Sequence, residues 1–186
     1  MKSSDLFVKC LEAEGVERIF GVPGEENADV MISLLDSPIE FVLCRHEQAA
    51  AFAADAYGRL TGKAGVCLGT LGPGVTNLLT GLADANMDRA PVVAIVGQGS
   101  TTRQHKESHQ IMDAIRMCEP ISKWAVSILA PDNITEVVRK AFKLAETEKP
   151  GVCVVELPED VAKKDVDDTP MIPRKVRRPA ADHKAI

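Results

Sequence analysis

Residues 66–87 read VCLGTLGPGVTNLLTGLADANM and contain the transition that decides the fold of this chain. A short apolar run at 66–70 is followed by Gly72-Pro73-Gly74, and the apolar residues from 75 to 87 then recur at helical spacing. A short continuous apolar run that ends in glycine and proline is typical of a strand buried on both faces. This stretch therefore predicts a strand, a tight turn and a helix in direct succession.

The same succession is repeated along most of the chain. Further apolar runs lie at 18–22, 40–44, 92–96, 122–126 and 152–156. Helical patterns lie at 5–15, 28–36, 48–60 and 133–148. Continuous apolar strands that alternate with helices predict a parallel sheet, and the right-handed crossover rule makes it doubly wound. We therefore predict an α/β fold with a mostly parallel, six-stranded sheet and helices on both faces. Ser3 or Ser4 is expected to cap the first helix.

The composition excludes several classes of protein. The 186 residues suit one domain, and 45% hydrophobic with 26% charged residues excludes disorder over most of the length. A net charge of −5 and 4% aromatic residues exclude a basic, aromatic-rich nucleic-acid surface. No apolar stretch reaches the roughly 18 residues of a membrane span. Five cysteines without a Cys-x-x-Cys pair indicate buried, reduced thiols in a cytoplasmic protein.

Candidate functional residues follow the predicted strands, because ligands of open α/β sheets bind beyond the carboxyl ends of the strands. The Gly-Pro-Gly segment fits either a tight turn or a ligand cradle, since glycines let backbone approach a ligand. Glu47 precedes an alanine-rich helix, where local sequence favours a helix-capping residue over a group that shares a proton with a ligand. His105 and His109 are four residues apart, but Lys106 stands where a zinc-protease helix carries glutamate, so no metal site is predicted.

Several motifs together indicate a family. In order, they are Gly21-Val22-Pro23-Gly24-Glu25, Arg45-His46-Glu47-Gln48-Ala49-Ala50, Ala56-Tyr57-Gly58-Arg59-Leu60-Thr61-Gly62-Lys63, Gly72-Pro73-Gly74-Val75-Thr76-Asn77, Ala83-Asp84-Ala85 and Pro91-Val92-Val93-Ala94-Ile95. Over about residues 3–162 the chain resembles the N-terminal pyrimidine-binding domain of thiamine-diphosphate-dependent enzymes, in particular the catalytic subunit of acetolactate synthase. The resemblance implies a flavodoxin-like, three-layer domain over residues 1–162.

The resemblance gives Glu47 a catalytic role in place of the capping interpretation. In the family this glutamate hydrogen-bonds N1′ of the aminopyrimidine and promotes the imino tautomer, which takes the proton from C2 of the thiazolium ring. On the substrate side the resemblance implies His109 and Gln110. The other cofactor-binding residues that it implies are Val22, Pro23, Gly24, Thr70, Gly72, Pro73 and Asn77.

The resemblance implies decarboxylation of pyruvate and ligation of the remaining two-carbon unit to a second 2-keto acid. Two departures from the family pattern make the binding of FAD doubtful. His109 precedes Gln110 as in flavin-independent, catabolic-type members, whereas biosynthetic members tend to carry phenylalanine there. Lys149 precedes Pro150-Gly151, where flavin-containing members usually carry an arginine that touches the flavin.

The other half of the family's cofactor site has no counterpart here. The family binds the diphosphate and Mg²⁺ through a second domain that carries Gly-Asp-Gly, and this sequence has none. We therefore expect residues 163–186 to be a linker toward a missing central domain. We also expect the chain to be inactive alone and to need the diphosphate-binding domain of a second subunit, in a homodimer or higher homo-oligomer. The alternatives are the α subunit of a split decarboxylase, of the sulfopyruvate or phosphonopyruvate type, and a non-catalytic binding module on the same fold.

Overall fold

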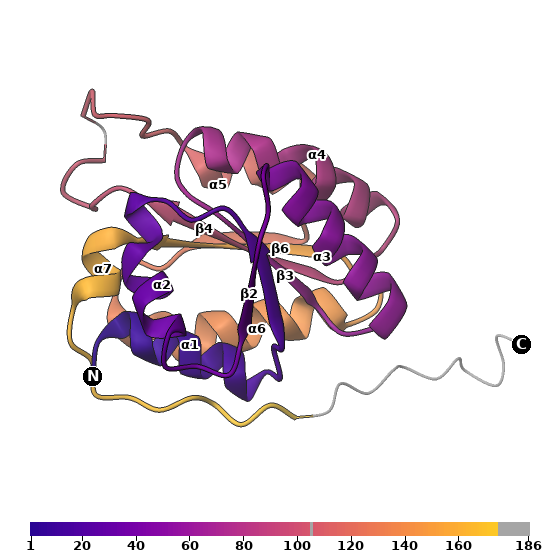
Figure 1. Cartoon of the computed structure of the whole chain (residues 1–186), viewed down its shortest axis with the longest axis horizontal. Coiled ribbons are helices and arrows are strands. Elements are labelled where there is room, and N and C mark those ends of the chain that lie inside the picture. Colours follow the sequence, from indigo (N-terminus) through magenta and orange to yellow (C-terminus); the bar gives the residue numbers. More distant parts are fainter. Residues whose placement is uncertain (105, 175–186) are drawn as a thin grey trace, which may run out of the picture.

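A computed structural model describes residues 1–104 and 106–174 and has the predicted α/β fold (Figure 1). Six strands form one sheet in the order β2-β1-β3-β4-β6-β5, and all neighbouring strands are parallel. The predicted sheet is therefore confirmed, and it is parallel throughout. The strands are β1 (Arg18–Gly21), β2 (Glu40–Leu43), β3 (Gly65–Gly69), β4 (Val92–Gln98), β5 (Trp124–Ser127) and β6 (Val152–Pro158). The α-helices are α1 (Ser3–Ala13), α2 (Ala28–Leu34), α3 (Glu47–Thr61), α4 (Pro73–Met87), α5 (Ala114–Cys118), α6 (Ile134–Glu146) and α7 (Glu159–Lys163).

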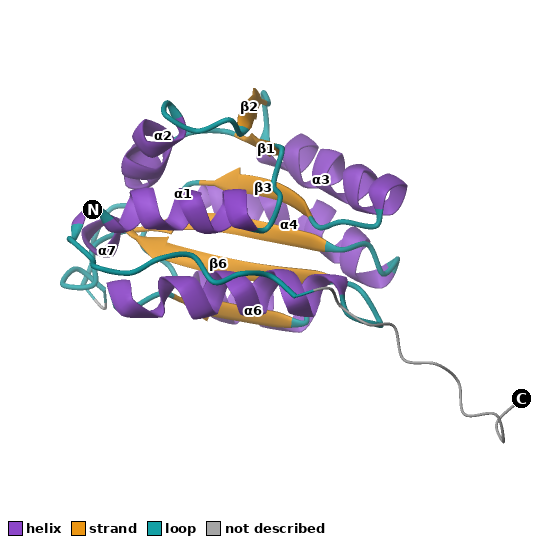
Figure 2. Ribbon diagram, turned by 90° about the horizontal axis from the view of Figure 1, so that it is seen from below, coloured by secondary structure: helices purple, strands orange, loops and turns teal. Residues whose placement is uncertain are grey.

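The helices cover both faces of the sheet and make three layers. Figure 2 shows α1 and α6 in front of the strands and α3 and α4 behind them. One buried hydrophobic cluster joins the sheet to α1, α2, α6 and α7, and a second joins it to α3, α4 and α5. The strands β3, β4 and β6 are buried along their whole length, as their uninterrupted apolar runs predict.

The cap of the first helix differs from the prediction. Ser3 and Ser4 lie inside the first turn of α1 and are fully buried, and Lys2 is the residue that precedes the helix. The Ser3 hydroxyl donates to the Lys164 carbonyl oxygen at 2.8 Å, so a tertiary contact uses the group expected to cap. The helix start is closed instead by Asp5, whose Oδ2 accepts from the Lys2 backbone N–H at 3.3 Å.

The chain after α7 pairs with the N-terminus. The Met1 amino group donates to the Val166 carbonyl oxygen at 3.0 Å, and the Val166 N–H donates back to Met1 at 2.9 Å. We call this pairing of residues 1–3 with 164–166 the N-terminal clasp. It lies at the beginning of the segment expected to be a linker, of which residues 175–186 are outside the described part of the chain.

The cysteines are free, and four of the five are buried, as the sequence predicts. Burial raises the pKa of the Cys118 thiol to about 11 and that of Cys10 to about 12. Thiols held in this form are weak nucleophiles, which fits structural residues in the two clusters.

The helix that begins with Glu47 lies very close to its neighbours because small residues face each other. A Cβ on Gly81 of α4 would lie 2.6 Å from the Cβ of Ala51 of α3. A Cβ on Gly65 of β3 would lie 2.0 Å from the carbonyl oxygen of Ala54. No side chain fits at either glycine, so glycine here fixes the position of α3 against both α4 and the sheet.

One guanidinium also links α3 to α4. Arg59 pairs with Asp55 through two hydrogen bonds of 2.8 and 2.9 Å, and it reaches Asp84 at 3.1 Å and Asp88 at 2.6 Å. Asp55 is only 5% exposed, so its carboxylate depends on this cation.

Arg59→Ala should therefore lower the free energy of unfolding by about 2 kcal/mol, because it leaves a buried carboxylate without its partner. The melting temperature should fall by roughly 5 °C for a domain of this size. Arg18→Ala is the matched control, since the Arg18–Glu40 pair is exposed at both ends and is worth under about 1 kcal/mol. Equal losses of melting temperature in the two variants would contradict the role given to Arg59.

Candidate functional site

Most of the predicted site residues follow β1, β2 and β3, which neighbour each other in the sheet, and His109 and Gln110 lie in the segment after β4. Glu47 is the first residue of α3. His46 precedes it and caps the helix, since His46 Nδ1 accepts from the Gln48 backbone N–H at 3.1 Å. Because the imidazole takes the capping position, the carboxyl of Glu47 is left for another role.

Glu47 is a buried carboxyl with one oxygen already bound. Its exposed fraction is 8%, and Oε2 accepts from Asn77 Nδ2 of α4 at 2.9 Å. Among the described residues no hydrogen bond reaches Oε1. A Cβ on Gly74 would lie 3.6 Å from Oε1, so glycine keeps the space beside this oxygen clear.

A second part of the site joins the loop after β1 to the loop after β3. A Cβ on Gly24 would lie 2.5 Å from the Cβ of Thr70, so only glycine allows this approach. The Gly24 N–H donates to Asn27 Oδ1 at 2.9 Å, and Thr70 Oγ1 donates to Glu26 Oε2 at 2.9 Å. Among the described residues Asn27 Nδ2 is buried without a partner, so one donor here is still available.

The loop after β3 also contacts the segment that carries Gln110. Gly72 has a positive φ of 56°, and a Cβ there would lie 2.7 Å from the Gln110 carbonyl oxygen. Gln110 itself has a φ of 57° and an exposed side chain. His109 is exposed too, and no hydrogen bond within the described residues ties it to Glu47.

The structure thus brings most of the predicted residues to one edge of the sheet. Val22 is held there by its N–H, which donates to the Leu68 carbonyl oxygen at 3.2 Å, while Pro23 and Pro73 are exposed. His105 lies outside the described residues. The residues placed at this edge are Val22, Pro23, Gly24, Glu47, Thr70, Gly72, Pro73, Asn77 and Gln110.

Two residues of the site were not predicted. Glu26 and Asn27 lie in a 3₁₀ turn at Glu25–Asn27, where both side chains bind neighbouring loop groups. Asparagine side chains commonly accept from backbone N–H groups in turns, and this tendency could have indicated Asn27. Nothing local distinguishes Glu26 from a solvent-exposed glutamate.

The residues present fit the pyrimidine end of thiamine diphosphate. An aminopyrimidine offers ring nitrogens and an amino group, and Glu47 Oε1 is a buried acceptor without a partner among the described residues. Within residues 1–104 and 106–174 no group of three or more His, Cys, Asp or Glu side chains could hold a metal ion. Among the same residues no helix is both long and apolar enough to cross a bilayer.

A doubly wound parallel sheet with a buried carboxyl and close-packed glycine loops at its carboxyl edge defines a cofactor-binding α/β domain. Residues 1–117 match the family described as thiamine pyrophosphate enzyme, N-terminal TPP binding domain. The chain belongs to this family.

The relatives of the chain include several acetolactate synthases. It is 49% identical to the catabolic acetolactate synthase of Raoultella terrigena over 158 residues, which cover 85% of this chain and 28% of that protein. It is 43% identical to the probable acetolactate synthase large subunit of Methanocaldococcus jannaschii over an alignment of 187 positions, which covers 100% of this chain and 32% of that protein. It is 42% identical to the acetolactate synthase of Bacillus subtilis over 160 residues, which cover 86% of this chain and 28% of that protein. The chain therefore spans less than a third of the length of these relatives.

Gly72→Ala should destabilise the domain more than Gly62→Ala. Gly62 has left-handed φ and ψ angles of 71° and 5°, where a substitution costs about 1 kcal/mol of backbone strain. Gly72 has φ 56° and ψ −116°, which lies outside the left-handed α region, so an alanine there is strained by more than at Gly62. Only at Gly72 would the added Cβ also collide with Gln110, whereas nothing lies within 4 Å at Gly62. Chemical denaturation should give losses of about 3 and about 1 kcal/mol, respectively. Amide NMR shifts at 108–111 should change in Gly72→Ala alone, and matching changes in both variants would contradict the contact.

Proposed function

We propose that this chain is the N-terminal, pyrimidine-binding part of a thiamine-diphosphate-dependent enzyme of the acetolactate synthase type. The whole enzyme decarboxylates pyruvate and ligates the remaining two-carbon unit to a second 2-keto acid. The observation that carries the proposal is the Glu47 carboxyl, which is buried beside glycine and has one oxygen free of hydrogen bonds from the described residues. The family match and the acetolactate synthase relatives support the same reaction class.

In this proposal Glu47 activates the cofactor. Asn77 holds Oε2, which leaves Oε1 to share a proton with a ring nitrogen of the pyrimidine. Bound thiamine diphosphate supplies the carbon nucleophile for decarboxylation and ligation. Thr70 and the glycines of the two loops shape the pocket around the ring, and His109 and Gln110 lie on the substrate side.

The proposed site is shared with a part of the enzyme outside this chain. The relatives are more than three times as long as the stretch that they share with it, which supports a separate domain for the diphosphate and Mg²⁺. We propose that this domain comes from a second subunit of a homodimer and that the chain is inactive alone. Apolar side chains exposed on α3 and α4, those of Phe52, Leu60 and Met87, support a partner surface on this face.

Two further features of the proposed enzyme rest on single residues. We propose that it works without FAD, because Lys149 stands where flavin-containing members carry arginine and His109 matches the flavin-independent type. We place it in the cytoplasm, since buried free thiols fit a reducing compartment.

Glu47→Gln in the complete enzyme should lower the rate of acetolactate formation from pyruvate by about 100-fold or more, because an amide does not share the proton. The amide oxygen still accepts from Asn77, so the fold should survive, and circular dichroism would verify this. Glu136→Gln, on the exposed face of α6, is the matched control and should keep full activity. Unchanged turnover in Glu47→Gln would refute the role of this residue.

Calorimetric titration of the 186-residue chain with thiamine diphosphate and Mg²⁺ should show very weak binding or none. The reason is that most of the cofactor's charge lies on the diphosphate, whose ligands we place in the other domain. Binding at micromolar concentration would show that the chain holds the cofactor without a partner and would overturn the shared-site proposal.

A further inference from the structure

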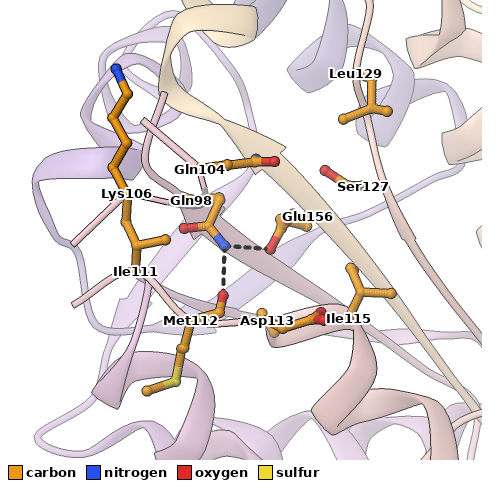
Figure 3. A pocket seen from close by; sticks show the side chains of 11 residues that line it. Gln98, Gln104, Lys106, Ile111, Met112, Asp113, Ile115, Ser127, Leu129 and Glu156 are labelled. Carbon is orange, nitrogen blue, oxygen red and sulfur yellow. Dashed lines mark hydrogen bonds between the residues drawn. The ribbon is translucent and has the colours of Figure 1, made fainter. Parts of the chain in front are cut away.

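A cavity of about 420 Å³ lies at the carboxyl ends of β4, β6 and β5 (Figure 3). Gln98, Glu156 and Ser127, at or near the ends of these three strands, reach it. In the sheet order these strands form the half opposite to β1 and β2, so the cavity is separate from Glu47. Its volume is in the range that encloses a small organic molecule.

The polar side of the cavity includes the buried carboxyl of Glu156, of which one oxygen accepts a hydrogen bond from Gln98. Glu156 is 3% exposed and Gln98 is 4% exposed. Gln98 Nε2 donates to Glu156 Oε2 at 2.9 Å and to the Met112 carbonyl oxygen at 3.1 Å, so both amide protons are used. The Ser127 hydroxyl is also buried and has no hydrogen-bond partner among the described residues. Two acceptors therefore face the cavity, the second Glu156 oxygen and Ser127 Oγ.

The cavity has more negative than positive charge around it. Glu156 and Asp113 both line it, and no ion pair joins Glu156 to a cation among the described residues. Lys106 is the one basic residue of the described lining, and Figure 3 shows its side chain extending away from Glu156. Burial raises the pKa of Glu156, and nearby Asp113 raises it further. The nearby Ser127 hydroxyl and the Gln98 amide lower the pKa of Glu156 and so oppose this shift. The Ser127 contact does not reach the geometry of a regular hydrogen bond.

The rest of the lining is mostly hydrocarbon. Ile111, Ile115 and Leu129 contribute apolar side chains, and Figure 3 shows them around the polar groups. A neighbouring cation stabilises the ionised form of a buried carboxyl, and hydrocarbon walls favour a ligand with a hydrocarbon part. A bare metal ion does not fit, because the described residues offer no cluster of three ligands.

We propose that this cavity binds a small organic cation, an alkylammonium ion, whose nitrogen is held by Glu156 and Ser127 and whose carbon chain packs against Ile111, Ile115 and Leu129. The ammonium group donates up to three hydrogen bonds and supplies the missing positive charge. The inference does not depend on the proposed function, since none of the Glu47 site residues lines the cavity.

The test is an NMR titration of the 186-residue chain with n-butylammonium chloride, and with 1-butanol as the neutral probe of equal chain length. Butylammonium should give saturable shifts at the amides of Gly99, Ser127 and Leu129, and 1-butanol should bind about tenfold more weakly or not at all. Glu156→Gln, whose amide oxygen still accepts from Gln98, should weaken butylammonium binding by about tenfold or more. Ser127→Ala is a second variant of smaller effect, about threefold, should the first fail to fold.

Glu136→Gln removes the same charge from the exposed surface of α6 and should leave butylammonium binding unchanged. Equal binding of the amine and the alcohol would overturn the proposal, as would equal binding to wild type and Glu156→Gln. Absence of saturable shifts at millimolar butylammonium would overturn it as well. Each result is separate from turnover by the complete enzyme, so this inference and the proposed function fail independently.

Discussion

The parallel direction of all six strands is the constraint on which the rest of this structure depends. Every strand delivers its following loop to the same edge of the sheet, so residues far apart in the sequence meet there. Glu47 and Asn77 meet in this way across 30 positions, and Gln98 and Glu156 across 58. One edge therefore carries two separate groups of polar residues, one on each half of the sheet.

The close packing of α3 against β3 and α4 fixes the position of the candidate site. Gly65 and Gly81 leave no room for a side chain between α3 and its neighbours β3 and α4. Arg59, near the C-terminal end of α3, links this helix to α4. Because Glu47 is the first residue of this tightly held helix, its carboxyl occupies a fixed place beside Asn77. The position of this carboxyl is thus decided by residues outside the candidate site.

The alternation of apolar runs and helices was enough to predict the sheet, its direction and the two covered faces. It did not give the insertion of β6 between β4 and β5, since that choice depends on packing between distant segments. Ser3 was expected to cap a helix, but the carbonyl of Lys164, 161 positions away, binds its hydroxyl. The family motifs predict Glu47, Thr70 and Asn77 as site residues, and the fold brings all three to one edge of the sheet. The local sequence does not indicate that the carboxyl of Glu156 is buried, because its hydrogen-bond partner Gln98 comes from the neighbouring strand.

The N-terminal clasp has a mechanical consequence. The antiparallel hydrogen bonds between Met1 and Val166 run across two extended segments, so tension on the chain beyond residue 166 loads them together in shear. Shear distributes the force over both bonds and over Ser3, which binds Lys164 through its N–H and its hydroxyl. A pull on the chain beyond residue 166 is therefore shared between α1, which it reaches through the clasp, and α7, which it reaches along the chain.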